Sequence, residues 1–204
     1  LARQAALGGG SASEAKDFAS DLSLLACRGR ALSDSPTSEA MLALLDGLQL
    51  SGLFQVVLDW ACLWPQLGAL AQVAPRAATE VLLEDGVGTL GTVLAPMGRV
   101  AWGGLALSIR LIRGTGQEVE ERVAAGSVRR FVLGAAEEAT VEVRPSRDLD
   151  IGMGRAGAGG RAKVRGGSLG LIVDTRGRPL VWPKEFSAEQ KAHCVNTWLE
   201  ELGR

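Results

Sequence analysis

Histidine, tyrosine and cysteine are scarce in this sequence of 204 residues, which has one histidine, no tyrosine and three cysteines. The single imidazole, His193, lies next to Cys194 in a predicted helix, where adjacent side chains point about 100° apart. These two residues therefore do not form the nucleophile–base pair that covalent catalysis needs. The cysteines are odd in number and far apart, without the spacing of a metal site. We expect reduced, buried thiols in a cytoplasmic protein, and the sequence predicts no catalytic residue and no metal ligand.

The chain also lacks an excess of either charge and lacks a long apolar run. Its 22 Lys and Arg residues against 23 Asp and Glu residues give a net charge of −1, which does not favour nucleic-acid binding. The most apolar segment, residues 53–70, is interrupted by Gln55, Asp59 and Pro65 and is too broken to span a bilayer. No secretory signal opens the sequence. Because the first residue is Leu1 rather than Met, we expect a fragment of a longer protein, with no membrane partner.

The first part of the chain has the pattern of alternating strands and helices. Residues 8–13 are predicted to be a loop and residues 14–19 a short helix. An apolar run in residues 21–26 predicts a strand, and residues 53–58 predict a second one. Between them, residues 37–48 have apolar side chains at helical spacing, and Ser35-Pro36 has the composition of a helix start. This order favours a βαβ unit with parallel pairing. Residues 61–73 and 75–83 are predicted to be two further helices.

From Gly86 onward, short alternating segments separated by glycines replace this pattern. Strands are predicted over residues 105–112, 118–123, 128–133 and 139–143. Their spacing of roughly ten residues is typical of a β-sandwich or barrel. Residues 151–167 contain seven glycines and predict a mobile loop. A helix is expected over residues 187–202, with Ser187 and Gln190 as a capping box. The fold class is therefore α/β followed by all-β, with one domain in residues 1–85 and a β-sandwich or barrel with a terminal helix in residues 86–204.

The glycines at 152, 154 and 157 match the Gly-x-Gly-x-x-Gly fingerprint of dinucleotide-binding proteins. That fingerprint works only when a strand precedes it and a helix N-terminus follows it, because the helix end binds the pyrophosphate. More glycines follow here instead of a helical pattern, so we interpret the segment as a loop.

The segment GGSLGLIVDTRGRPLVWP, residues 166–183, has the composition of a β-hairpin. An apolar strand over residues 169–173 would be followed by a turn at residues 174–178 and a return strand at residues 179–182. In such a turn Asp174 would bond the turn backbone. Arg176 and Arg178 would either stabilise the turn or bind a carboxylate or phosphate of a partner. All three are therefore candidate partner-binding residues.

Four stretches carry a family resemblance: DLSLLACRGRALSDSPTSEAMLALLDGLQLSG, WPQLGALAQVAP, LGTVLAPMG and GGSLGLIVDTRGRPLVWP. In this order they resemble the glutamate mutase L family, predicted ATPases of the actin-like/sugar-kinase superfamily, over roughly residues 20–183. The resemblance implies that residues 1–85 are part of an actin-like (ribonuclease H-like) lobe. It further implies a role in maintaining or reactivating a cobalamin-dependent mutase, which would be the protein partner.

The sequence departs from that family at its nucleotide-binding positions. The phosphate-binding Asp-x-Gly-x-Thr loop is missing, and the Gly-Gly turn is replaced by Cys27-Arg28-Gly29-Arg30. The resemblance therefore makes only Gly29 a cofactor-binding residue, beside two arginines that would crowd a nucleotide or offer charge to a phosphate. We expect a non-catalytic C-terminal portion whose β domain docks a partner, with no cofactor in this chain and ATP in a full-length protein. The alternatives are a truncated ATP-binding actin-like ATPase and a small-ligand-binding β domain.

Overall fold

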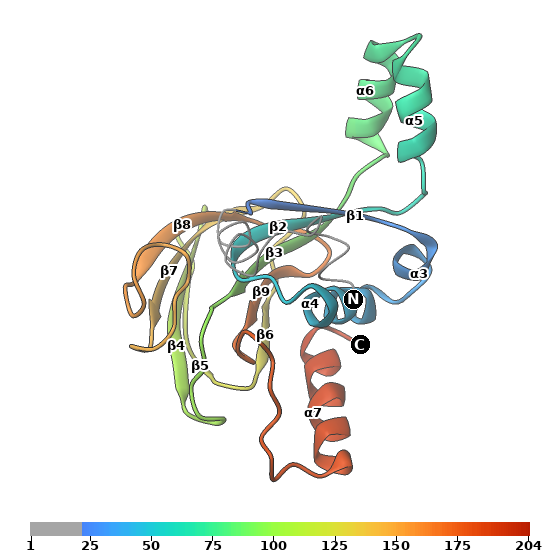
Figure 1. Cartoon of the computed structure of the whole chain (residues 1–204). Coiled ribbons are helices and arrows are strands. Elements are labelled where there is room, and N and C mark those ends of the chain that lie inside the picture. The colour runs from blue at the N-terminus through green and yellow to red at the C-terminus, as the bar shows by residue number, and fades with distance from the viewer. Residues whose placement is uncertain (1–21) are drawn as a thin grey trace.

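A computed structural model of the chain describes residues 22–204, so the loop and short helix expected in residues 8–19 lie outside the described residues. The elements follow in this order: β1 (Leu24–Arg28), α3 (Arg30–Ser33), α4 (Thr37–Leu48), β2 (Gly52–Asp59), α5 (Trp64–Ala71), α6 (Pro75–Glu84), β3 (Gly88–Ala95), β4 (Leu105–Arg113), β5 (Glu118–Ala124), β6 (Val128–Phe131), β7 (Glu138–Pro145), β8 (Gly160–Arg165), β9 (Gly170–Asp174) and α7 (Ala188–Glu201). The fold is mixed α/β (Figure 1).

In the part of the chain that the structure describes, the strands form two sheets. The five-stranded sheet has the order β1-β2-β3-β9-β6, and the four-stranded sheet has the order β5-β4-β7-β8. Within the first sheet β1 and β2 are parallel, as expected, and so are β3 and β9, while the other neighbours are antiparallel. The second sheet is antiparallel throughout. The described strands do not close into a barrel, so that part of the expectation is wrong.

The five-stranded sheet takes strands from both sides of residue 86. Strand β2 pairs with β3 over most of its length, from Gly52 opposite Ala95 to Leu58 opposite Gly88. A boundary at residue 86 therefore does not coincide with a division between the two sheets. The change of pattern in the sequence at this point marks the return from α6 into the same sheet.

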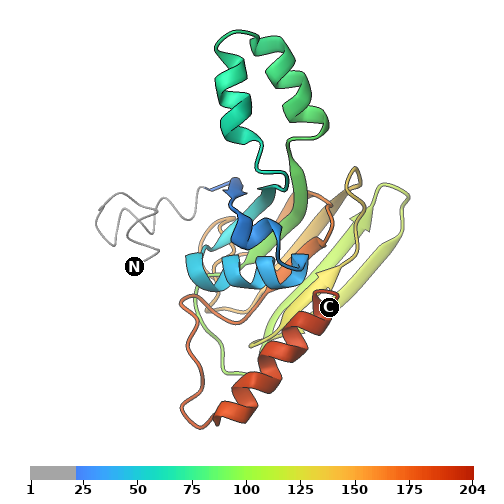
Figure 2. The same ribbon diagram turned by 90° about the vertical axis from the view of Figure 1, so that its right-hand side faces the viewer.

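Two clusters of buried side chains hold the layers together. Met41 and Leu45 of α4 and Trp198 of α7 pack with Val56 and Leu58 on one face of the five-stranded sheet. Figure 2 shows α4 and α7 on this same side of the sheet. Alternate side chains of β3, β9 and β6 point to the opposite face and pack against the four-stranded sheet; they include Leu94, Leu171, Val173 and Phe131. The four-stranded sheet thus covers one half of that face.

Most predicted elements appear close to their expected positions. Helix α4 begins at Thr37, but Ser35 does not cap it: Pro36 is the N-cap residue, and the Ser35 hydroxyl donates to the carbonyl of Ala31 instead. Helix α7 has the predicted capping box between Ser187 and Gln190. No helix among the described residues is long and apolar enough to cross a membrane.

The glycine-rich segment expected to be a mobile loop is more ordered than predicted. Residues 160–165 form β8, which pairs with β7 along its whole length. In the loop before β8, the side chain of Ile151 is buried. The backbone N–H groups of Asp150 and Met97 each donate to the other residue's carbonyl oxygen. Gly160 takes its place in the strand because its lack of a side chain leaves room for Met153, which an added Cβ would approach to 2.3 Å.

Candidate functional site

The outer face of the five-stranded sheet is hollowed where the four-stranded sheet does not cover it. This groove has a volume of about 620 Å³. Its floor is formed by alternate residues of three strands: Leu24 and Ala26 of β1, Gln55 and Val57 of β2, and Thr89 of β3. The neighbouring residues Leu25, Cys27, Val56 and Leu58 point to the other side, into the core beneath α4.

The hairpin formed by α5 and α6 provides the wall of the groove. Figure 1 shows this pair of helices projecting away from the sheets. Helix α5 contributes Trp64, Leu67, Gly68 and Ala71, whose spacing places them on one helix face. Helix α6 adds Ala78, Thr79 and Leu82. Apart from Ala78, none of the residues of the two helices is buried, so the apolar face of the hairpin is open to a ligand.

Two polar contacts fix the base of the hairpin. The buried carboxylate of Asp59, at the end of β2, accepts hydrogen bonds from the backbone N–H groups of Leu63 and Trp64 at 2.8 and 3.0 Å. These groups lie at the start of α5, where N–H groups lack partners within the helix. The indole N–H of Trp64 donates to the carbonyl oxygen of Gly86 at 2.6 Å, beyond the end of α6. The Trp64 side chain therefore connects the start of α5 to the segment that follows α6.

Two residues of the groove, Gly68 and Arg165, differ from the rest of its lining in size and in charge. An added Cβ on Gly68 would meet no atom within 4 Å other than those of its chain neighbours and the backbone of its own helix, so the groove has free space beside this residue. Arg165, at the end of β8, is the only charged residue among the described residues that line the groove. Its backbone is held by Thr92, whose hydroxyl donates to the Arg165 carbonyl at 2.6 Å. Its guanidinium forms no ion pair with any residue of 22–204.

The groove was not expected from the sequence. The sequence predicts the two helices but not the surface that they enclose together with the sheet. Trp60 lies before α5 begins, and Trp64 lines the groove. One signal was available: residues 64–71, WPQLGALA, contain no charged side chain, which is unusual for a helix whose surface is solvated.

Gly29 lies apart from the groove, between β1 and α3. Its φ of +128° is a conformation that favours glycine. An added Cβ would meet nothing within 4 Å apart from the adjacent residues. The carbonyl of Gly29 accepts the N–H groups of Leu32 and Ser33 and so starts α3. Gly29 lies at the carboxyl end of a parallel strand, which is where ligands of α/β sheets bind. The neighbouring side chains of Arg28 and Arg30 are both exposed at this end of β1.

The predicted hairpin of residues 166–183 does not form. Strand β9 is present, but it is an interior strand, with β3 on one edge and β6 on the other. Both rows of its backbone hydrogen-bonding groups are therefore occupied, and residues 179–182 cannot pair with it. These residues are turn and irregular structure. The segment that was expected to be an exposed turn is instead buried, with Asp174 0%, Arg176 2% and Arg178 4% exposed.

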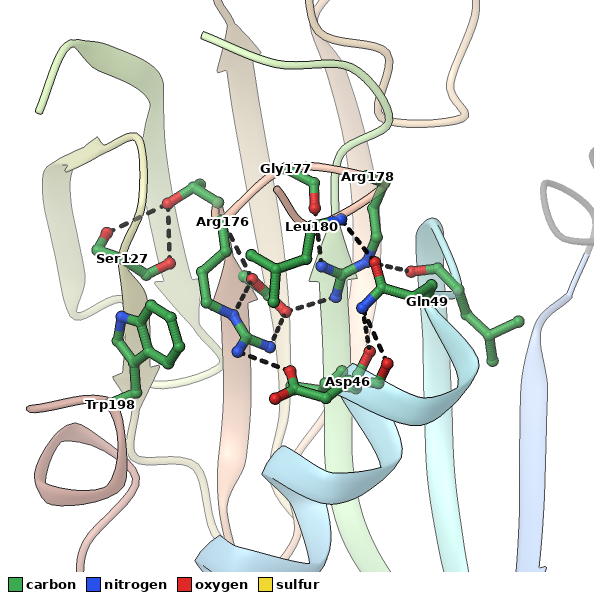
Figure 3. A network of polar contacts seen from close by, with 12 residues as sticks. Asp46, Gln49, Ser127, Arg176, Gly177, Arg178, Leu180 and Trp198 are labelled. Atoms are coloured by element: carbon green, nitrogen blue, oxygen red, sulfur yellow. Dashed lines mark hydrogen bonds and ion pairs between the residues drawn. The ribbon is translucent and has the colours of Figure 1, made fainter. Parts of the chain in front are cut away.

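Asp174, Arg176 and Arg178 form one buried ionic network (Figure 3). Arg178 Nη2 also donates to Oδ2 of Asp174, and Arg178 Nε donates to the carbonyl of Leu50 at 3.0 Å. Arg176 Nη1 lies 2.7 Å from Oδ1 of Asp46 on α4, and its guanidinium stacks over the Trp198 ring of α7 at 4.5 Å. The network thus joins the end of β9 to the two helices that cover the sheet, α4 and α7. Of its two carboxylates, Asp46 is exposed and Asp174 is buried.

The charges in this network shift the acid–base behaviour of its members. Burial alone would raise the pKa of Asp174, but the guanidiniums of Arg178 and Arg176 hold that pKa well below its usual range. Burial opposes the charge of Arg176 as well, and Asp174 and Asp46 nevertheless raise its pKa. All the charges are therefore retained in the folded protein. A partner could reach this network only at Asp46, so it acts first as an internal tie between elements.

In a comparison with known proteins, no family model, curated protein or solved structure matches this chain. The resemblance to glutamate mutase L therefore stays a prediction.

Proposed function

We propose that this chain is a non-catalytic protein-docking module, and that its groove binds the apolar face of an α-helix from a partner protein. This keeps the docking role expected from the sequence but places it between the five-stranded sheet and the α5–α6 hairpin. The observation that carries the proposal is the uncovered half of the sheet face, with its apolar floor and wall.

The layer arrangement supports a helix as the occupant. Parallel strands are normally covered on both faces, and helices are the usual covering elements. Beneath β1 and β2 this layer is supplied by α4, whereas the groove face has no such layer in residues 22–204. Leu24 is 50% exposed and Val87 38% exposed. Burying such side chains is the main source of favourable free energy in protein association.

Charge complementarity specifies the partner further. The lining is apolar apart from Gln55, two threonines and Arg165. A guanidinium that a partner covers must be paired, because an uncompensated buried charge is costly. We therefore expect the partner helix to have apolar residues at spacings of three and four, with one Asp or Glu at the end that meets Arg165.

The sequence resemblance suggests a cobalamin-dependent mutase as the first partner to test. Binding of ATP by a longer protein also remains a prediction, attached to Gly29. A small-ligand site inside a barrel loses its structural basis, because the described strands form no closed barrel and the space between the two sheets is filled by core side chains.

Site-specific photocrosslinking tests the proposal. A photoreactive amino acid replaces Thr79, whose side chain lines the groove, and the crosslinked peptide is identified by mass spectrometry in the native lysate and with a purified mutase. A synthetic peptide of the crosslinked segment is then titrated by calorimetry. We expect an apolar helical segment that binds the wild-type chain.

The matched variants are Gly68→Leu and Gly47→Leu. Both glycines lie in helices, and an added Cβ meets nothing within 4 Å at either one, but only Gly68 lines the groove. We expect Gly68→Leu to weaken peptide binding at least about tenfold, which corresponds to about 1.4 kcal/mol, and Gly47→Leu to leave it unchanged. Equal affinities of the two variants, or crosslinks only to a second copy of this chain, would refute the proposal.

A further inference from the structure

Strand β1 is an outer strand of the five-stranded sheet, and half of its backbone groups have no partner in the sheet. The N–H of Gln55 donates to the carbonyl of Ser23 at 2.9 Å, and Gln55 is the register partner of Leu24. In a parallel ladder this places the bonding groups of Leu25 and Cys27 toward β2. The N–H and C=O groups of Leu24, Ala26 and Arg28 therefore point away from the sheet. No described residue pairs with this edge (Figure 1).

The other sheet edges among the described residues are protected. Strand β8 carries Arg161, Lys163 and Arg165, and β5 has four charged residues among its seven. Strand β6 has two arginines that contact the end of α7: Arg129 pairs with Glu201, and Arg130 donates to the carbonyl of Leu202. Charged side chains and covering helices are the devices by which proteins prevent unwanted pairing at an edge.

Strand β1 has neither device along most of its length. Its residues Leu24, Leu25, Ala26 and Cys27 are all apolar, and only Arg28 is charged. Leu24 and Ala26 face the groove, while Leu25 and Cys27 face the core. Side chains that are apolar on both faces are typical of an interior strand of a parallel sheet. The sequence of β1 is thus that of a strand with neighbours on both sides.

We infer that the free edge of β1 pairs with an extended strand of the docked partner, which adds a strand to the sheet. This rests on the proposed function, because the added strand belongs to the protein whose helix fills the groove. Main-chain hydrogen bonds provide affinity in this mode, and side chains provide specificity. The added strand requires apolar residues on the face it shares with Leu24 and Ala26. Arg28 and Arg30, both exposed, favour an acidic residue at the carboxyl end of β1.

The partner captured at the groove is the probe, and hydrogen exchange is the first measurement. The amides of Leu24, Ala26 and Arg28 should exchange freely in the chain alone and at least about tenfold more slowly in the complex. A helix that only filled the groove would leave these outward-pointing amides unprotected. Unchanged exchange at all three amides in a complex that Gly68→Leu weakens overturns the strand inference and leaves the proposed function standing.

Substitution at Ala26 provides the second measurement. Proline is tolerated at an edge when its missing N–H faced away from the ladder, so Ala26→Pro removes one outward donor without removing a bond to β2. Ala26→Ser keeps that donor and is the matched control. We expect Ala26→Pro, once circular dichroism shows that it folds, to bind the partner at least about tenfold more weakly than Ala26→Ser. Equal binding overturns the inference. If the amides of β1 are protected by a partner that Gly68→Leu does not affect, the proposed function fails while the strand pairing is upheld.

Discussion

Asp174 and Arg176 form a bidentate pair in which Nε and Nη2 of the guanidinium donate to the two carboxylate oxygens, each at 2.9 Å. Both side chains are completely buried. Two parallel hydrogen bonds of this kind fix the relative orientation of their partners as well as their distance. Because Arg176 also reaches Asp46 and Trp198, the pair sets the positions of α4 and α7 on the sheet.

Replacing Asp174 by Asn should destabilise the fold strongly. The substitution keeps the shape of the side chain but leaves the buried guanidiniums of Arg176 and Arg178 without their central anion. Breaking a buried ion pair on one side typically costs about 3–5 kcal/mol. Urea unfolding followed by circular dichroism measures this change. The control is Glu80→Gln, which removes an exposed ion pair with Arg76 and should leave the midpoint unchanged; similar midpoints for both variants would contradict the role of the network.

Because the ionised Asp174 stabilises the fold, the protein should lose stability in acid. The folded-state pKa of Asp174 is depressed, so the unfolded chain takes up this proton at a higher pH than the folded one. The contribution of Asp174 is therefore complete above its unfolded pKa of about 4 and is lost as the pH falls below that value toward the folded pKa. Thermal unfolding from pH 7 to pH 3 should show a smaller difference between wild type and Asp174→Asn at the acid end. A constant difference would show that Asp174 is not the group responsible.

Elements whose signals are local could be predicted from the sequence. The spacing of Met41, Leu44, Leu45 and Leu48 identified α4, and Ser187 with Gln190 identified the start of α7. The parallel pairing of β1 and β2 followed from the order of strand, helix and strand. In each case the residues that determine the element lie within it or directly beside it.

Features that depend on distant neighbours could not be predicted in this way. The composition of residues 166–183 is the same whether β9 is one leg of a hairpin or an interior strand, and the choice was decided by β3 and β6 occupying its edges. Asp174 and Arg178 therefore looked like turn residues although they are buried. The groove likewise depends on where the four-stranded sheet stops covering the five-stranded one, which no local pattern encodes.

Gly91→Ala should disrupt the pairing of β3 with β9. Gly91 has a φ of +152°, and an added Cβ would lie 2.2 Å from the carbonyl oxygen of Gly170 in the neighbouring strand. Both the unfavourable dihedral angle and the collision with backbone must be relieved by moving the strands, at a cost of about 2–5 kcal/mol in total. Chemical denaturation should detect it. Gly47→Ala, in α4 with free space around it, should instead stabilise the protein by up to about 1 kcal/mol.

Cys27 should be the least reactive of the three thiols in the folded protein. Its side chain is buried in the core beneath β1, and burial raises its pKa to about 11. Only the thiolate is nucleophilic, so about a thousandth of Cys27 is in the reactive form at pH 8. Cys62 and Cys194 are only half-buried and provide internal controls. Alkylation by iodoacetamide, quantified for each cysteine by mass spectrometry, should modify these two first, and all three together in guanidinium chloride. Modification of Cys27 at the rate of Cys62 in the folded chain would mean that β1 detaches from the core, which would also remove the edge that we propose for strand pairing.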